Sequence, residues 1–264
     1  MEQAGNGPPK GSIFLPRAYR SAGFTYHPAS SLGYPKLLVF FLSFMQKTAL
    51  IAGASGLIGS QLLPLLLASD RYSKVIAVGR RPIPQVHPKL EQRVLAFDKL
   101  EEHAMRLIAD DVYCCLGTTM RQAGSKEAFY RVDYLYVVTL AALTARNFAV
   151  QLLLVSAMGA DPTARIYYNR VKGEAEQAVR ELPFRTIHIF RPSLLLGERE
   201  EKRRGEQLGA VLLRVLNPVL VGPLRKYRAV SGVAVARAML QAASKDSSGI
   251  QVHPSDEIAQ TSNL

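Results

Sequence analysis

Cysteine is scarce in this sequence of 264 residues, and its two cysteines, Cys114 and Cys115, are neighbours within one apolar run. Adjacent side chains of a strand point to opposite faces of the sheet, so a disulfide between these two is not expected. No histidine or third cysteine lies close by in the chain to complete a site. We predict two buried, reduced thiols in a reducing compartment, and no metal site.

The sequence also lacks an apolar run long enough to cross a membrane as a helix, which takes about 20 residues. Residues 37–45 are apolar over only nine positions and follow basic residues, like the core of a signal peptide. No small-residue cleavage site follows before the regular pattern begins. We predict no stable membrane insertion and a cytoplasmic protein; membrane association through residues 37–45 is the alternative.

Acidic residues are nearly absent from residues 1–36, where Glu2 is the only one. This segment is rich in Gly, Pro, Ser and Tyr and has neither helical nor strand periodicity. We predict that residues 1–46 form a disordered or poorly structured N-terminal extension and that the folded domain spans residues 47–264. Met45 is expected to be the natural start, with the preceding segment an upstream extension of the reading frame.

Acidic residues are outnumbered in the whole chain as well, which carries a formal net charge of +12. Such a charge raises the question of a nucleic-acid or membrane-surface partner. The basic residues are spread along the chain, however, and the densest cluster, residues 198–206, also contains four glutamates. We expect no nucleic-acid partner, and interpret the charge as a solvated surface that favours anionic ligands.

From Lys47 onward, short apolar runs alternate with segments of helical spacing, the pattern of repeated βαβ units. The chain is long enough for one well-buried domain. We predict an α/β protein with a doubly wound parallel sheet of the Rossmann, NAD(P)-binding type, and a small C-terminal substrate lid at about 194–228. The expected strands are residues 48–52, 74–78, 93–97, 111–116, 150–156, 185–190 and 250–253, and the expected helices are 57–68, 100–109, 126–147, 166–181 and 233–243.

A turn with three evenly spaced glycines joins the first expected strand to the first expected helix. In this context glycines permit a tight turn, let the backbone approach a pyrophosphate, and let the helix pack closely on the strand. The helix N-terminus then offers free N–H groups to the phosphates. We predict a dinucleotide site formed by Gly53, Ser55, Gly56, Leu57, Ile58 and Gly59.

The end of the second strand indicates which dinucleotide binds. A carboxylate there favours NAD, whereas an arginine accommodates the 2′-phosphate of NADP. The sequence has Arg80 and Arg81 at this point and no acid. A guanidinium pairs bidentately with phosphate, so we predict NADP(H) as the preferred cofactor and NAD(H) as the alternative. Two exposed loop charges are the competing interpretation.

Two further strand ends are expected to face the cofactor. Asp98, at the end of the third strand, is placed to contact the adenine, although a solvated turn aspartate is the alternative. After the fourth strand, Leu116, Gly117 and Thr118 can touch the ribose and nicotinamide end.

Ser156, Tyr168 and Lys172 form the candidate catalytic set. Ser156 ends the fifth expected strand, and Tyr168 and Lys172 are four residues apart on the next helix, so they share one face. A tyrosine can exchange a proton with a carbonyl or alcohol oxygen, but its free pKa of about 10 is too high for neutral pH. A nearby ammonium lowers that pKa, and the serine hydroxyl can orient the carbonyl.

These motifs in this order resemble those of the atypical short-chain dehydrogenase/reductases of the Tat-interacting-protein oxidoreductase type, and of short bacterial relatives labelled nucleoside-diphosphate-sugar epimerases. The resemblance covers about residues 47–243 and rests on the glycine turn and on residues 113–119, 123–126, 155–160, 168–174 and 191–193. The resemblance implies that NADP(H) binds at the glycine turn, with Arg80 and Arg81 near the 2′-phosphate. It implies that Ser156, Tyr168 and Lys172 are catalytic and that Tyr168 and Lys172 also contact the cofactor. Beside the nicotinamide it places Arg191, Pro192 and Ser193. The segment 230–234 departs from the family by lacking an aspartate.

Three functions follow as hypotheses. The first is an NAD(P)-dependent oxidoreductase that acts on a small carbonyl or alcohol substrate with Tyr168 as general acid and base; a nucleotide-sugar epimerase would use the same residues. The second is an NADP(H)-sensing regulatory protein without significant turnover, and the third a charge-driven nucleic-acid or membrane binder. The sequence leaves the substrate open, and also the oligomeric state, for which a homodimer is one option.

Overall fold

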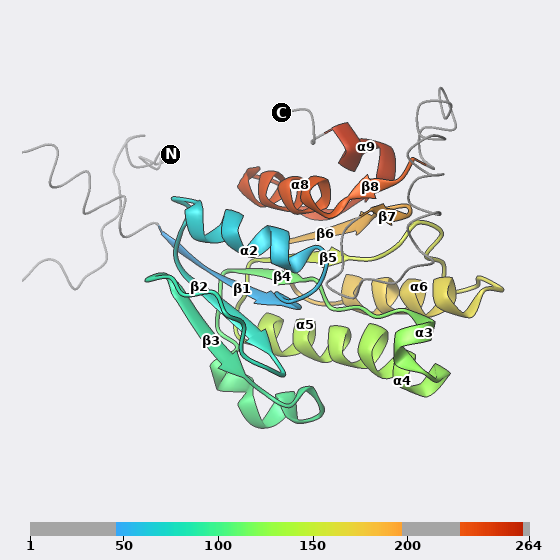
Figure 1. Ribbon diagram of the computed structural model, residues 1–264, viewed down its shortest axis with the longest axis horizontal. Helices are drawn as coiled ribbons and strands as arrows, with labels where there is room; N and C mark the ends of the chain where they lie inside the picture. Colours follow the sequence, from blue (N-terminus) through green and yellow to red (C-terminus); the bar gives the residue numbers. More distant parts are fainter. Residues whose placement is uncertain (1–45, 197–227, 261–264) are drawn as a thin grey trace, which may run out of the picture. The chain divides into compact units, whose positions relative to one another are not determined.

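Seven parallel strands form the central sheet of the computed structural model, which describes residues 46–196 and 228–260 (Figure 1). Their order across the sheet is β3-β2-β1-β4-β5-β6-β9. This is the doubly wound arrangement, in which the order reverses between β1 and β4, and the predicted fold class is confirmed. The strands are β1 Lys47–Ala52, β2 Tyr72–Gly79, β3 Leu90–Val94, β4 Asp111–Cys114, β5 Gln151–Val155, β6 Thr186–Arg191 and β9 Gly249–Pro254.

Both faces of this sheet are covered, which explains the continuous apolar runs of its inner strands. In β1, Leu50 and Ala52 belong to one buried cluster and Ala49 and Ile51 to the other. All five residues of β5 are buried. Successive side chains of a strand point to opposite faces, so a strand between two helical layers is apolar at most positions, and a polar residue such as Gln151 at its start is the exception.

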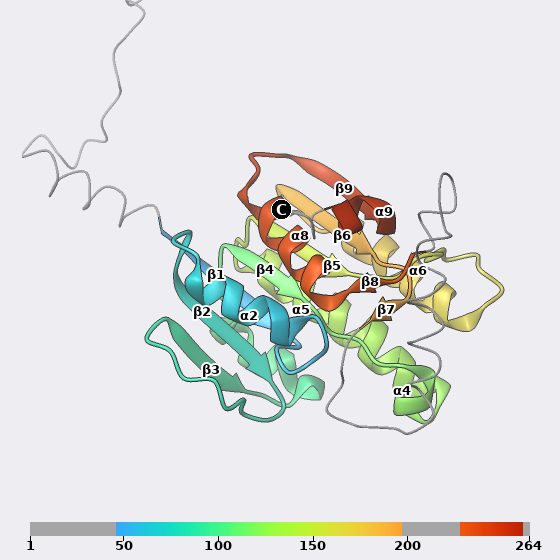
Figure 2. The same ribbon diagram turned by 45° about the horizontal axis from the view of Figure 1, so that its top comes forward.

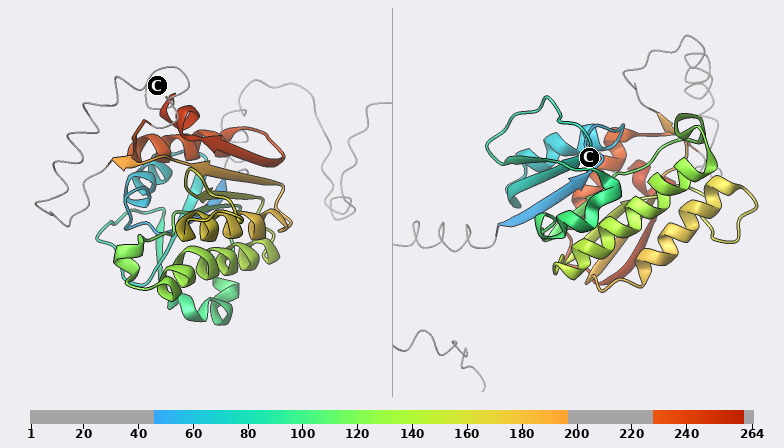
Figure 3. Two further views of the ribbon diagram at one scale, coloured as in Figure 1. Left: turned by 90° about the vertical axis from the view of Figure 1, so that its right-hand side faces the viewer. Right: turned by 90° about the horizontal axis from the view of Figure 1, so that it is seen from below.

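Two layers of helices supply the cover (Figures 1 and 2). The helices α2, α8 and α9 pack on one face, where Leu62, Leu66 and Met239 are buried. The opposite face is covered by η2, α5 and α6, seen from below in the right panel of Figure 3, with Leu100, Leu140 and Val179 buried. The bounds are α2 Gly59–Ala68, η2 Phe97–Arg106, α5 Tyr136–Arg146, α6 Tyr167–Arg180, α8 Gly232–Ser244 and α9 Ser255–Gln260.

The single helix predicted over residues 126–147 is wrong in detail. It is divided into α4 (Lys126–Tyr130), the π-helical turn η3 (Arg131–Leu135) and α5, and a short helix α3 (Met120–Ala123) precedes it. The 3.6-residue periodicity does not distinguish a wide π turn from a regular helix. Such turns are frequent at functional sites, and this one contains Asp133.

The third strand lies earlier than predicted: β3 ends at Val94, and residue 97 begins the 3₁₀ helix η2. This strand is at the edge of the sheet and none of its residues is fully buried, so no apolar run marks it. Asp98 is consequently the second residue of η2, and its predicted position at a strand end is wrong.

Most of the predicted lid lies outside the described residues, which stop at position 196 and resume at 228. Two short strands stand on either side of this interval. β7 (Leu195–Leu196) pairs in parallel with β8 (Val230–Ser231), immediately before α8. The predicted extension of residues 1–46, with the run 37–45, falls outside the described residues up to position 45.

Candidate cofactor and catalytic site

A cavity of about 470 Å³ lies at the carboxyl ends of β1, β2 and β4. This is where the strand order reverses, the usual ligand position in a doubly wound sheet. The residues around it come from the glycine turn, the β2 end, β3 and the residues after β4. Those predicted to bind cofactor are Gly53, Ser55, Gly56, Arg80, Arg81, Leu116 and Gly117.

The glycine turn has the geometry that its glycines permit. Gly53 has φ of +86°, and a Cβ on it would lie 2.5 Å from the carbonyl oxygen of Cys115. A Cβ on Gly59 would lie 2.1 Å from the carbonyl oxygen of Gly53, so α2 packs directly on the turn. Among the described residues no side chain caps the N-terminus of this helix, and the N–H groups of Ser60 and Gln61 donate instead to the carbonyls of Gly56 and Ile58, over 2.9 and 3.0 Å.

The variant Gly59→Ala is expected to lose stability by about 1–3 kcal/mol, because the added methyl group overlaps backbone that cannot move alone. Displacement of α2 is also expected to weaken dinucleotide binding. Thermal unfolding and a fluorescence titration with NADPH measure the two effects. The neighbouring exposed Ser60 supplies the control Ser60→Ala; if both variants behave alike, close packing at position 59 is not required.

Arg80 and Arg81 directly follow β2, are exposed, and line the cavity. No aspartate or glutamate is among the described residues that line it. Asp98 is not one of them: its Oδ1 accepts a hydrogen bond of 2.6 Å from the Tyr136 hydroxyl, and Tyr136 lines the cavity instead. The described cavity wall is therefore basic where the second strand ends.

Four other residues that were predicted to bind the cofactor, Leu57, Ile58, Gly59 and Thr118, are not among the residues that line the cavity. Leu57 and Ile58 lead into α2, which begins at Gly59, and Ile58 and Gly59 are buried behind the lining residues. Thr118 lies beyond the lining Gly117 and donates its backbone N–H to Asp133 Oδ2 over 2.9 Å. The loop after β4 is thereby connected to the π-helical turn.

Lys172 lies behind the cavity as half of a buried ion pair. Its Nζ is 2.8 Å from Asp133 Oδ1, and the two side chains are 6% and 0% exposed. A Cβ on the lining Gly117 would be 3.4 Å from this Nζ. Burial alone lowers the pKa of Lys172, but the negative charges of Asp133 and of ionised Tyr168 oppose it and raise that pKa above its usual value. The lysine is held as a cation.

Tyr168 is the second residue of α6 and lies one helical turn before Lys172. Its side chain is half-buried. Its ring packs at 5.4 Å between centroids on Phe129 of α4. Among the described residues its hydroxyl has no hydrogen-bond partner, whereas the hydroxyl of neighbouring Tyr167 donates to the Lys126 carbonyl over 3.0 Å. Of the two adjacent tyrosines, Tyr168 has the hydroxyl available for a ligand.

Ser156 follows β5, and its hydroxyl donates to Glu176 Oε1 over 2.5 Å. Glu176 lies one turn after Lys172 and is 2% exposed. Its carboxylate also accepts two hydrogen bonds from Arg191, of 3.0 Å from Nε and 2.6 Å from Nη2. The structure thus joins Ser156 and Arg191, two predicted site residues, through a carboxylate that the sequence reasoning had not singled out.

Pro192 and Ser193 face neighbouring segments in the described structure. The Pro192 carbonyl accepts the N–H of Met158 over 2.9 Å. Ser193 accepts a hydrogen bond from the Ser255 hydroxyl over 2.8 Å and donates to the Arg228 carbonyl. None of Arg191, Pro192 and Ser193 lines the described cavity.

Asp133 and Glu176 were missed from the sequence, although each left a signal. Glu176 continues the four-residue spacing of Tyr168 and Lys172 on one helix face. Asp133 is a lone acid four residues from Phe129 and from Val137, both buried. An acid on an otherwise apolar face needs a buried partner, here the lysine.

The described residues contain no group of three or more metal-ligating side chains. Cys114 is buried and Cys115 half-buried, and both are free; burial raises the pKa of Cys114 to about 11. Within the same part of the chain, no helix has the length and apolar character that crossing a membrane requires.

The fold, glycine turn and basic cavity define a nicotinamide-dinucleotide type of domain, and comparison with known proteins agrees. The model of the NAD dependent epimerase/dehydratase family matches residues 49–252. The chain belongs to this family. The predicted resemblance is confirmed.

Among the similar proteins is Protein HTATIP2 of Rattus norvegicus, 39% identical over 198 residues, which are 74% of this chain and 80% of the relative. Protein FMP52, mitochondrial, of Eremothecium gossypii is 32% identical over 216 residues, 80% and 95% of the two chains. Two solved structures share the fold. MoeE5 in complex with UDP-glucuronic acid and NAD has TM-score 0.61 and 20% identity, over 78% and 75% of the chains. The oxidoreductase ylbE from Lactococcus lactis has TM-score 0.57 and 18% identity, over 82% and 97%.

Proposed function

We propose that this protein is an NADP(H)-dependent oxidoreductase that transfers hydride to or from a small carbonyl or alcohol substrate. The observation that carries the cofactor choice is the described cavity wall, with two arginines at the end of β2 and no carboxylate. The observation that supports turnover is Tyr168, whose hydroxyl is available one helical turn from the buried cation of Lys172.

The residues fit a nicotinamide dinucleotide. The turn at Gly53 and Gly56 leaves room for a pyrophosphate beside the positive end of the α2 dipole, and Arg80 and Arg81 provide donors for a 2′-phosphate. When bound, the nicotinamide supplies or accepts the hydride. Lys172, held charged by Asp133, lies one helical turn from Tyr168, whose hydroxyl can give a proton to a carbonyl oxygen or take one from an alcohol.

The double variant Arg80→Ala/Arg81→Ala is expected to weaken NADPH binding at least about tenfold, since hydrogen bonds to charged groups contribute about 1.5–3 kcal/mol each. NADH lacks the 2′-phosphate and should bind almost as before. Fluorescence titration with both dinucleotides measures the ratio. The control Arg106→Ala/Arg146→Ala removes the same charge from exposed positions outside the cavity; equal weakening of NADPH and NADH would overturn the preference.

One observation favours a second candidate, an NADP(H)-sensing protein without significant turnover: the Ser156 hydroxyl donates to Glu176, so its proton is not free for a substrate oxygen. Turnover of NADPH with a panel of aldehydes, ketones and quinones separates the two functions. Consumption of NADPH supports the reductase, and tight binding without consumption supports the sensor. Interconversion of a nucleotide sugar without net NADPH consumption would identify an epimerase.

The cellular compartment and oligomeric state stay predictions. The FMP52 relative is named mitochondrial, whereas a cytoplasmic location was expected from the sequence. Cell fractionation of the full chain, together with light scattering of the purified protein, tests the location and the homodimer.

A further inference from the structure

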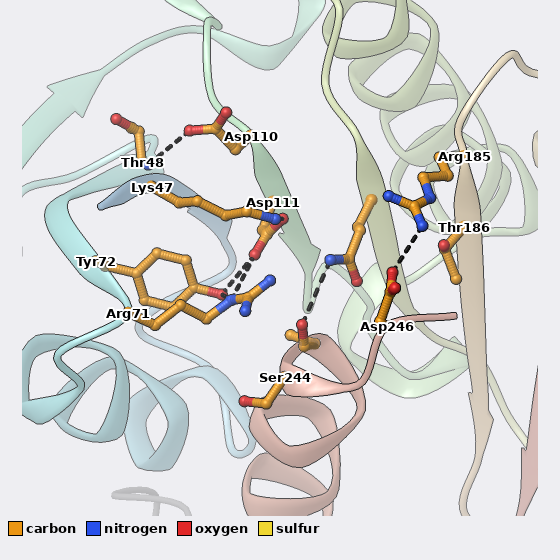
Figure 4. Close-up of polar contacts among 12 residues, drawn as sticks. Lys47, Thr48, Arg71, Tyr72, Asp110, Asp111, Arg185, Thr186, Ser244 and Asp246 are labelled. Atoms are coloured by element: carbon orange, nitrogen blue, oxygen red, sulfur yellow. Dashed lines mark hydrogen bonds and ion pairs between the residues drawn. The ribbon is translucent and has the colours of Figure 1, made fainter. Parts of the chain in front are cut away.

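A second cavity, of about 150 Å³, lies at the opposite end of the sheet, where the strands begin. Figure 4 shows the polar contacts among side chains around it. Lys47, Gln151 and Thr186 are the first residues of β1, β5 and β6, and Ser244 ends α8. The cavity is therefore separate from the cofactor site at the carboxyl ends. Its lining consists of Lys47, Arg71, Val150, Gln151, Arg185, Thr186, Ser244, Lys245, Asp246 and Ser247.

Positive charge dominates this second cavity. Four of its lining residues are basic and one, Asp246, is acidic. The fully buried Asp111 lies behind them, 3.3 Å from Lys47 Nζ and 3.0 Å from Arg71 Nε. Asp110 also stands at these strand starts, where its Oδ2 accepts the N–H of Thr48 over 2.7 Å. Four cations against these three carboxylates leave one positive charge at the cavity.

Several of the donors in this second cavity have no partner within residues 46–196 and 228–260. Arg71 uses Nε for Asp111 and the Tyr72 hydroxyl, and its two terminal nitrogens have no hydrogen-bond partner among the described residues. Within those residues Lys245 likewise makes no hydrogen bond or ion pair through its ammonium group. Arg185 pairs with Asp246 over 2.6 Å, but that carboxylate side chain is 87% exposed and can be replaced by another anion.

Gln151 adds an acceptor that needs a donor. This side chain is 6% exposed, and its Nε2 donates to the Ala243 carbonyl over 3.3 Å. Its Oε1 is buried without a partner in the described structure, as is the Ser247 hydroxyl oxygen. A buried amide oxygen left unpaired is costly, so a ligand here should both carry negative charge and donate a proton.

We propose that this cavity binds inorganic phosphate in its hydrogen-bearing form. The charged oxygens accept from Arg71, Arg185 and the lysines, and the P–OH group donates to Gln151 Oε1. The volume is about five times the ~30 Å³ share of one liquid water, enough for a tetrahedral oxyanion. Sulfate has the same shape but no proton at neutral pH, and a phosphate monoester loses its last proton above a pKa of about 6.

Titration calorimetry of the full chain tests this, with phosphate, sulfate and methyl phosphate at constant ionic strength and about pH 7.5, above the monoester pKa of about 6. Phosphate is expected to bind at least about tenfold more tightly than the other two, the effect of one hydrogen bond in a charged site. Equal affinity for phosphate and sulfate would overturn the proposal, as would binding of methyl phosphate as tight as that of phosphate. Absence of phosphate binding at millimolar concentration would also overturn it.

Substitutions of residues that line the second cavity test whether phosphate binds there. The exposed pair Arg185→Ala/Lys245→Ala should weaken phosphate binding about tenfold or more, and Asp246→Asn should strengthen it severalfold because Arg185 is released. The matched control Lys99→Ala/Arg237→Ala removes the same charge elsewhere on the surface and should change nothing. If both double variants weaken phosphate equally, the binding is unspecific and the proposal fails.

The cofactor cavity is also basic, so phosphate binding there has to be separated from binding at this site. Repeating the titration with Arg80→Ala/Arg81→Ala should leave the phosphate affinity unchanged. Loss of phosphate binding in this variant would place the anion at the cofactor cavity and overturn the proposal.

Discussion

Replacing Tyr168 with phenylalanine is expected to lower kcat about 10²–10⁴-fold, the usual contribution of a positioned general acid or base. The substitution removes one oxygen and keeps the ring that packs on Phe129. The fold and dinucleotide binding should therefore survive. Steady-state oxidation of NADPH with an accepted carbonyl substrate, alongside NADPH titration, measures both properties.

The adjacent tyrosine provides the control for this experiment. Tyr167→Phe removes the same atom from a side chain whose hydroxyl bonds to the Lys126 carbonyl. It is expected to leave kcat within a factor of a few, because this hydroxyl already has a protein partner. Comparable loss in the two variants, or full activity of Tyr168→Phe, would show that Tyr168 does not transfer the proton.

Replacing Asp133 with alanine is expected to lower the free energy of unfolding by about 3–5 kcal/mol, the cost of leaving one member of a buried ion pair alone. Lys172 is 6% exposed, and without Asp133 its burial would either leave the cation unpaired or force the loss of its proton, each at a cost in stability. The N–H of Thr118 would lose its acceptor as well. Urea unfolding followed by circular dichroism gives the difference.

Two further variants show whether the loss of stability in Asp133→Ala comes from the unpaired buried charge or from the missing side chain. In Asp133→Ala/Lys172→Met no charge is left unpaired, so much of the stability should return while activity stays low. Glu102→Ala breaks the exposed pair between Lys99 and Glu102, for which a cost of about 0–1 kcal/mol is expected. If Asp133→Ala costs no more than this surface variant, the ion pair does not stabilise the site.

The elements with a strong local pattern were predictable. Parallel strands covered on both faces form nearly continuous apolar runs, so β1, β4 and β5 were predicted close to their observed limits. The amphipathic spacing located α2, α6 and α8 for a similar reason. The edge strand β3 was misplaced, because half-exposed positions leave no apolar run, and η3 was missed because a π turn has no pattern of its own.

Side-chain partnerships between distant segments could not be predicted. The sequence reasoning grouped Ser156 with Tyr168 and Lys172, whereas the fold directs the Ser156 hydroxyl to Glu176 and the Lys172 ammonium to Asp133. Either acid alone resembles a solvated helix residue. The packing of α6 against η3 and β6 removes water from both carboxylates. A buried carboxylate needs a partner in place of water, which is Lys172 for Asp133 and the Ser156 hydroxyl for Glu176.

By itself, the sequence determined the parallel sheet, the glycine turn and the arginines after β2, because backbone freedom, apolar periodicity and charge at a strand end are local properties of the chain. The tertiary structure decided which groups are buried together: the pair of Asp133 and Lys172 behind Gly117, and the basic cavity at the strand starts. Those arrangements depend on segments far apart in the chain meeting where water is excluded. Electrostatic interactions become strong enough there to hold a charge or bind an anion.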